Sequence, residues 1–125
     1  MPVIDHVDLR VGDVARCKPF YDAFLKEYGF RGKAQPDGSQ LYYRIEERQV
    51  REVIVVNGEA DHRPNANRLA FFAATRADVD RIAAAAQSAG ARAYEPPAAC
   101  PEYTESYYAA FFEDPDGNRL EVVNR

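Results

Sequence analysis

Residues 107–123 read YYAAFFEDPDGNRLEVV, a stretch in which two apolar segments flank a short polar one. The apolar segments predict strands over residues 106–113 and 119–123, because aromatic and β-branched side chains favour extended chain. The DPDG sequence at 114–117 predicts a tight turn, in which proline fixes φ and glycine accepts a positive φ. It lacks the acidic ladder of a calcium loop and the lysine of a phosphate loop, so we expect a structural role.

The residues before this hairpin predict three further elements. These are a strand over residues 68–74, a helix whose apolar stripe is Val79, Ile82, Ala83 and Ala86, and a short strand over residues 92–95. Thr75 and Asp78 resemble a capping box, with Asp in place of the more usual Glu, and Gly90 follows the helix as a C-cap glycine would. We expect the prolines at 96 and 97 to end the short strand.

The first half of the chain predicts the same order of elements. These are a strand over residues 3–11, a helix over residues 14–28, a short segment near residue 30, and strands over residues 41–46 and 52–56. Asp13 is a suitable N-cap for the helix, and Gly29 is a suitable C-cap. In the first strand, the alternation places His6 on one face and Val7 on the other.

The two halves can be overlaid, which indicates an internal duplication. Placing His6 on Arg68 brings the helix-ending glycines to within one residue of each other. Near the ends of the halves, VVN at 55–57 overlays VVN at 122–124, which sets Ile54 against Glu121. The chain is therefore predicted to be one domain over residues 1–125, of class α+β, with βαβββ modules at about 1–58 and 66–125.

Composition excludes several kinds of partner. The 125 residues include 16 Lys and Arg against 20 Asp and Glu, a net charge of −4 that argues against nucleic acid or an anionic membrane. Two cysteines are too few for a disulfide framework or a cysteine zinc site, and we expect free thiols in a reducing compartment. No basic segment precedes an apolar run near the N-terminus, and no apolar run is long enough to span a membrane, so we expect a cytoplasmic protein.

Three stretches resemble the vicinal oxygen chelate superfamily, which includes glyoxalase I, extradiol dioxygenases and the fosfomycin and bleomycin resistance proteins. They are IDHVDLRVGDVARCKPFYDAFLKEYGF at 4–30, NRLAFFAATRADVDRIAAAAQSAGA at 67–91 and the closing hairpin. The resemblance implies two modules whose mixed sheets curve around a central cavity, with the helices outside. It also implies a small-molecule ligand and a homodimer.

In metal-dependent members, ligands come from the first and last strand of each module. Carried over, these positions are His6, a position at or near Ile54, Arg68 and Glu121. His6 and Glu121 have suitable donor atoms for zinc, nickel, manganese or iron, whereas Arg68 is a permanent cation without an acceptor. Ile54 has no donor either, but Glu52 is two residues away and can face the same side of its strand. A metal site of His6, Glu52 and Glu121 is one interpretation.

The other interpretation is a pocket without a bound cofactor or metal. Glu121 would then pair with Arg68, and His6 would form a hydrogen bond within that cluster or to a tyrosine, because buried charges need partners. The ligand-binding residues predicted for this pocket are His6, Arg68, Tyr108 and Glu121. The only other histidine, His62, lies in a polar loop, where a solvated side chain is commoner than a metal ligand.

Five tyrosines, at positions 42, 43, 103, 107 and 108, lie in or just before the predicted strands. Because neighbouring residues on a strand point to opposite faces, only one of each adjacent pair can face a cavity. A pocket lined by one or two of these rings, with Arg68 and Arg10 as candidates to add positive charge, would suit a small aromatic or anionic ligand.

Two function classes follow from these interpretations. The first is a protein that binds or sequesters a small molecule without a complete catalytic metal site. The second is a metal-dependent enzyme, such as a glyoxalase-like lyase, an isomerase, an epoxide-opening transferase or a dioxygenase. Its substrate would carry adjacent oxygens, and Glu121, as the candidate catalytic residue, or a nearby carboxylate would move protons.

Overall fold

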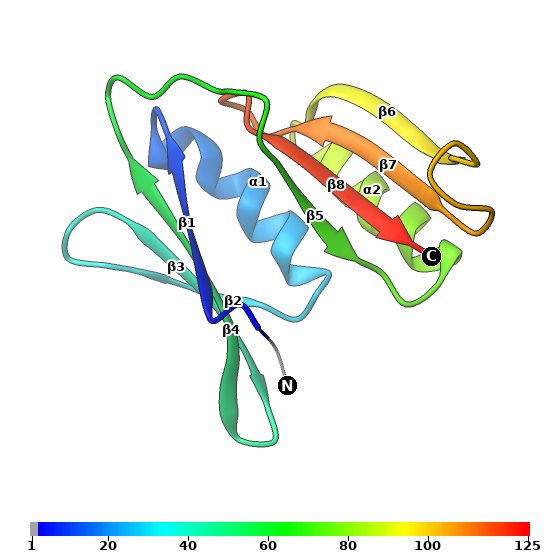
Figure 1. The fold of residues 1–125 in the computed structure, drawn as a ribbon. Coiled ribbons are helices and arrows are strands. Elements are labelled where there is room, and N and C mark those ends of the chain that lie inside the picture. Colours follow the sequence, from blue (N-terminus) through cyan, green and yellow to red (C-terminus); the bar gives the residue numbers. More distant parts are fainter. Residues whose placement is uncertain (1–2) are drawn as a thin grey trace. The chain divides into compact units, whose positions relative to one another are not determined.

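Each half of the chain folds as strand, helix and three strands in the computed structural model, which describes residues 3–125 (Figure 1). The chain divides into a first unit, Met1–Arg63, and a second unit, Pro64–Arg125. Each unit has one helix and one four-stranded mixed sheet, so the predicted α+β class with two βαβββ modules is confirmed. Residues 1 and 2, where the first module was expected to begin, lie outside the described residues. Within the described part, neither helix has the length and apolar composition that crossing a bilayer requires.

The first unit pairs its first strand with its last. Its elements are β1 (His6–Val11), α1 (Val14–Lys26), β2 (Arg31–Ala34), β3 (Gln40–Glu46) and β4 (Gln49–Gly58). The strand order is β1-β4-β3-β2, with β1 parallel to β4 and the other pairs antiparallel. The side chain of Asp13 accepts from the backbone N–H of Arg16, as its predicted N-cap role requires, and Gly29 follows the helix with a positive φ.

Helix α1 covers one face of this sheet with an apolar stripe. Its fully buried side chains are Cys17, Phe20, Tyr21, Phe24 and Leu25. A large apolar side chain buried in this way contributes about 1.5–3 kcal/mol. The hydroxyl of Tyr42 on β3 donates to Asp22 on α1 at 2.7 Å, which identifies the face of the sheet that the helix covers.

The second unit repeats this arrangement. Its elements are β5 (Arg68–Phe72), α2 (Arg76–Ser88), β6 (Arg92–Ala99), β7 (Tyr108–Glu113) and β8 (Arg119–Asn124). The strand order is β5-β8-β7-β6, with β5 parallel to β8, and α2 lies behind the strands in Figure 1. The side chain of Thr75 accepts from the backbone N–H of Asp78, as the predicted cap requires.

The strand β6 runs through the two prolines that were expected to end it. It occupies the edge of the sheet, and its pairing with β7 is irregular on both sides of Glu95. Proline is tolerated at an edge because its missing N–H does not interrupt a ladder on both sides. The predicted stop after residue 95 is therefore wrong.

Two turns show contrasting chemistry. In the DPDG turn, Asp114 is fully buried and accepts from the backbone N–H groups of Asp116 and Asn118, which is the structural role that the sequence predicted.

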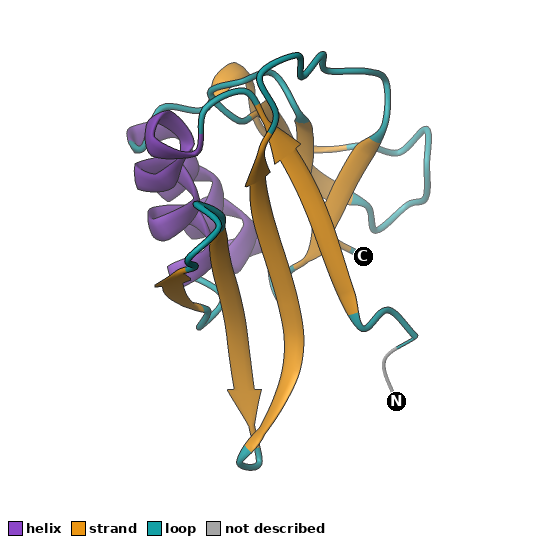
Figure 2. Cartoon of the chain, turned by 90° about the vertical axis from the view of Figure 1, so that its left-hand side faces the viewer, coloured by secondary structure: helices purple, strands orange, loops and turns teal. Residues whose placement is uncertain are grey.

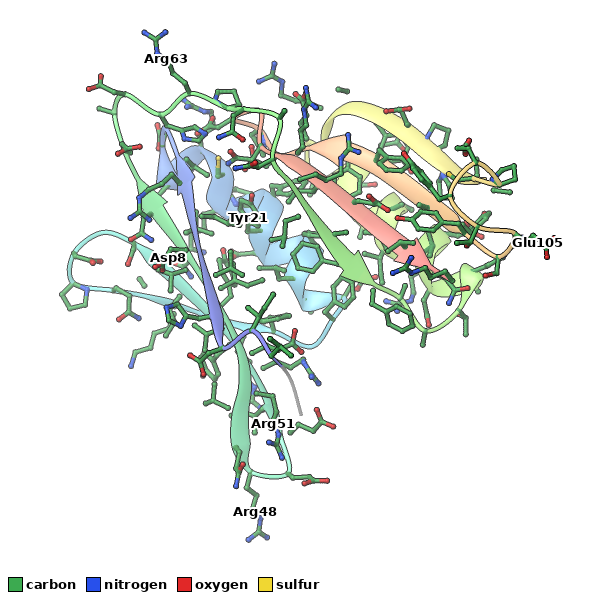
Figure 3. All side chains as sticks on the ribbon, in the orientation of Figure 1. Asp8, Tyr21, Arg48, Arg51, Arg63 and Glu105 are labelled. Carbon is green, nitrogen blue, oxygen red and sulfur yellow. The ribbon has the colours of Figure 1, made fainter. Side chains whose placement is uncertain are left out.

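The turn that joins β3 to β4, at the bottom of Figure 2, consists of Glu47 and Arg48. Both have positive φ, 51° and 65°, although neither is glycine, and Arg48 points away from the sheet at the tip (Figure 3).

Candidate functional site

The strand register of the second unit places Arg68 and Glu121 on the same face of the sheet. In this register Arg68 pairs with Arg119, and Ala70 pairs with Glu121. Phe111 on β7 lies directly opposite Glu121 on the other side. Residues in register share a face, so these side chains stand together on the face away from α2. We call it the Glu121 face; it includes Arg68, Ala70, Phe72, Tyr107, Ala109, Phe111, Glu121 and Val123.

Glu121 is a nearly buried carboxylate, 5% exposed, with one side-chain partner. The hydroxyl of Tyr107 donates a short hydrogen bond to its Oε2 atom. Burial, followed by this bond to the carboxylate, raises the pKa of Tyr107 to about 12, so the phenol stays a donor at neutral pH. Within residues 3–125 the carboxylate of Glu121 makes no other hydrogen bond, which leaves Oε1 as an acceptor for a ligand.

Arg68 lies over an aromatic ring instead of forming the predicted ion pair with Glu121. Its guanidinium carbon is 4.8 Å from the centroid of the Phe111 ring, a cation–π distance. The side chain of Arg68 makes no other interaction with the described residues, so its guanidinium N–H groups are available to an anion. The expected pairing of Arg68 with Glu121 is corrected: Tyr107 is the partner of Glu121.

Further aromatic and apolar groups adjoin Tyr107. The ring of Tyr103 lies 4.8 Å from that of Tyr107, and the guanidinium of Arg125 lies 5.7 Å from it. Tyr107 also packs on a small apolar cluster that includes Cys100, in which burial raises the pKa of the thiol. The face therefore places one carboxylate and two guanidinium groups, those of Arg68 and Arg125, among aromatic rings.

Tyr108 lies on the other side of the sheet, so its predicted place in the ligand-binding set is corrected. Its hydroxyl donates to Asp80 of α2 at 2.6 Å, and the guanidinium of Arg76 lies 4.8 Å from its ring centroid. Adjacent residues of a strand face opposite sides, and the register gives Tyr107 the position beside Glu121. Phe111 was not predicted as part of the site, although counting outward from the DPDG turn would have paired it with Glu121.

In the first unit, His6 lies on the face of the sheet away from α1, and Asp8, which is labelled in Figure 3, shares that face by alternation along β1. Its Nδ1 atom is 2.9 Å from Asp5 Oδ2, and about half of its side chain is exposed (52%). The hydrogen bond with Asp5 and the charge of Asp8 raise its pKa. The expected bond of His6 to Glu121, Arg68 or a tyrosine is therefore corrected in favour of Asp5.

Glu52 and Ile54 face the opposite side of the first sheet from His6. His6 pairs with Val53, and Ile54 pairs with Tyr42, whose side chain points to α1. Glu52 shares the Ile54 side by alternation and forms an ion pair with Arg44 at 2.7 Å. The proposed grouping of Glu52 with His6 is not what the structure shows.

The register also corrects the overlay of the two halves by one residue. Since His6 pairs with Val53 and Arg68 pairs with Arg119, the position equivalent to Glu121 is Val55, not Ile54. Aligning the two VVN triplets shifted one half by one residue relative to the strand register. A shift of one residue exchanges the two faces of a strand. Val55, like Ile54, has no atom that can bind a metal.

His62 lies in the loop after β4, half-buried instead of solvated. Its backbone N–H donates to Glu59 at 2.9 Å, and its Nε2 atom is buried without a hydrogen-bond partner among the described residues. Neither unit, over residues 3–125, gathers three or more His, Cys, Asp or Glu side chains as a metal site requires. The four family positions hold an imidazole, an aliphatic side chain, a guanidinium and a carboxylate already bonded to Tyr107, a donor set that does not fit a catalytic divalent metal.

Comparison with known proteins agrees with this fold. The model of the Glyoxalase/Bleomycin resistance protein/Dioxygenase superfamily matches residues 3–122. A glyoxalase/bleomycin resistance protein from Albidiferax ferrireducens T118 is 26% identical, with 99% of each chain covered and a TM-score of 0.75. The fosfomycin resistance protein FosX from Mesorhizobium loti is 17% identical, over 100% of this chain and 93% of that one, with a TM-score of 0.70. A search of curated proteins gave no match.

Proposed function

The chain belongs to the glyoxalase/bleomycin resistance protein/dioxygenase superfamily, and on that basis we propose that it binds a small organic molecule without a catalytic metal. The observation that carries the proposal is the position of Arg68, which lies over Phe111 at one of the four ligand positions of the family. A permanent cation has no lone pair for a metal and repels one nearby. It attracts an anionic or aromatic ligand instead.

The remaining positions support the same proposal. Val55 offers only hydrocarbon, and the Oε2 atom of Glu121 already accepts from Tyr107. A carboxylate fixed by a neutral phenol among aromatic rings is suited to orienting an organic molecule through a few polar contacts. In this proposal Glu121 binds ligand; its predicted catalytic role in proton transfer remains a prediction.

Metal analysis tests the metal-free part of the proposal. Protein purified without chelator and incubated with nickel, zinc, manganese or iron should retain well under one ion per chain. The variant Arg68→His replaces the cation by an imidazole on the same face of the second sheet as Glu121 and should gain metal affinity. Arg76→His is the matched control, because Arg76 lies over a ring at the same distance on the α2 side. Stoichiometric metal in the wild-type chain that is lost in His6→Ala would refute the proposal in favour of a metal-dependent enzyme.

Ligand binding can be measured separately from metal content. Small aromatic and anionic compounds at millimolar concentration should raise the melting temperature of the wild-type chain by mass action. The rise should shrink in Arg68→Met and persist in Arg76→Met. If no such compound raises the melting temperature of the wild-type chain, the binding part of the proposal is refuted.

We extend the proposal to a cytoplasmic homodimer, the state expected from the family resemblance. Both cysteines, Cys17 and Cys100, are buried free thiols, as suits a reducing compartment. Light scattering across a range of protein concentrations tests the dimer. A mass equal to that of a single chain at every concentration would exclude it.

A further inference from the structure

The sheet of the first unit carries apolar side chains on its face away from α1. Three cross-strand pairs of β3 and β4 form this apolar stripe: Leu41 with Val55, Tyr43 with Val53, and Ile45 with Val50. Tyr42, whose hydroxyl bonds to α1, marks the opposite face, so its neighbours in the alternation turn away from the helix. A bulge at Arg51 keeps Val50 opposite Ile45 on the same face as the other pairs.

The outer pair of the stripe lies on an arm that no other strand flanks. Strand β1 pairs with β4 only from Val53 onward, and β2 pairs with β3 only as far as Tyr43. Residues 44–52 therefore form a two-stranded hairpin, seen at the bottom of Figure 2. On this arm Ile45 and Val50 are 45% and 57% exposed, while the inner pairs are half-buried. A continuous apolar stripe that reaches water is typical of a surface that another protein covers.

Charges of opposite sign border the stripe on the same face. Strand β1 contributes Asp8 at one edge, and β2 contributes Lys33 at the other. One row across the sheet thus runs from a carboxylate through two apolar side chains to an ammonium group. In the next row, β2 contributes Arg31, and β1 contributes His6, which is bonded to the exposed carboxylate of Asp5. Asp8, Arg31 and Lys33 are exposed and form no ion pair with a described residue.

We propose that this face binds the same face of a second copy of the chain, about a twofold axis parallel to the strands. This inference rests on the homodimer of the proposed function and names its surface. The rotation places β4 of each copy over β3 of the other, so the two stripes cover each other as the inner faces of a β-sandwich do. It also places the β1 edge of each copy over the β2 edge of the other. Asp8 of each copy then meets Lys33 of the other, and the pair occurs twice.

The charges also select this axis over the other twofold arrangement of the same faces. An axis across the strands would place the acidic β1 edges over each other. Like charges that face each other oppose association, whereas opposite charges favour one orientation. Arg10, which shares the face of Asp8 by alternation, lies one row beyond the end of β2, so it faces no residue of that strand.

Light scattering by the full chain over a range of protein concentrations measures the dimer. Val50→Glu places a charge on the stripe at an exposed position and should raise the dissociation constant of the dimer about tenfold or more. Ala84→Glu, at an exposed position of α2 in the second unit, is the matched control and should leave this constant unchanged. Far-UV circular dichroism should give the same spectrum for both variants and the wild-type chain.

A charge exchange tests the orientation. Asp8→Lys and Lys33→Asp each put like charges opposite each other twice in the dimer, and each should raise the dissociation constant about tenfold. The double variant Asp8→Lys/Lys33→Asp restores both pairs with their signs exchanged, so its dissociation constant should return to nearly the wild-type value. A double variant that associates as weakly as the single variants would overturn the twofold arrangement.

The outcomes separate this inference from the proposed function. A dimer that is unaffected by Val50→Glu and by both charge reversals would overturn the surface and leave the homodimer intact. A single-chain mass of the wild-type chain at every concentration would overturn both the surface and the homodimer. Binding of small aromatic and anionic compounds is measured separately, through the shifts in melting temperature that depend on Arg68, and does not stand or fall with the dimer.

Discussion

Replacing Tyr107 by Phe should cost about 1.5–3 kcal/mol of unfolding free energy, the range for a hydrogen bond to a charged group. The change removes a single hydroxyl and keeps the ring that packs beside Cys100 and Tyr103. It leaves Glu121, only 5% exposed, without its side-chain partner. Urea unfolding at pH 7, followed by far-UV circular dichroism, measures the loss.

A double-mutant cycle isolates the bond from its surroundings. Glu121→Leu removes the carboxylate, and the pair Tyr107→Phe/Glu121→Leu removes both partners, so the double variant should be more stable than the sum of the single losses predicts. Tyr103→Phe is the matched control, because its hydroxyl makes no hydrogen bond to a described residue and its side chain is exposed. A coupling below about 0.5 kcal/mol, or an equal loss in Tyr103→Phe, would refute the assignment of this bond.

The same bond predicts a dependence on alkaline pH. The pKa of Tyr107 is raised to about 12, above the value near 10 of an unfolded tyrosine. The neutral phenol is therefore favoured in the folded chain, and its contribution is complete below pH 10 and lost as the pH rises toward 12. The stability difference between wild type and Tyr107→Phe should stay level from pH 7 to 9 and decrease above 10.

Three further predictions concern the first unit. Arg48→Gly should stabilise the chain by about 0.5–1 kcal/mol, because Arg48 has a positive φ that glycine adopts without strain. Removing this strain outweighs the larger loss of backbone entropy of glycine on folding, and thermal unfolding measures the difference. Tyr42→Phe should destabilise it by about 1–3 kcal/mol in urea, since a buried hydroxyl no longer reaches Asp22. The pKa of His6 should lie above its usual value by NMR titration and decrease in Asp5→Asn; the stabilisation from Asp5 is present below pH 6.5 and lost as the pH rises through the raised value.

Much of the fold could be predicted because local chemistry specified it. The caps at Asp13 and Thr75 fixed where both helices begin, and the positive-φ glycines fixed where they end. The continuation of β6 through its prolines could not be predicted in the same way. A proline is tolerated where no neighbouring strand requires a backbone N–H at that position. This depends on the place of the strand in the sheet and not on the sequence of the segment.

The candidate site was predicted less completely, and two of the errors share one cause. Arg68 and Glu121 were identified, but Tyr108 was chosen where Tyr107 stands, and Ile54 was placed in the slot that Val55 occupies. Each of these two errors is one residue along a strand. Alternation gives two sets of residues but does not say which set faces the helix, and only pairing with a neighbouring strand decides this.

The pairing of the first strand with the last in each unit determines when that unit can form during synthesis. The strand β5 begins at Arg68, and its partner β8 begins at Arg119. While the ribosome makes the intervening residues, β5 has no partner within its own unit. The sheet on which helix α2 packs is therefore complete only after the last residues have been made. Because Glu121 lies on that last strand, the candidate ligand site is among the final parts of the molecule to assemble.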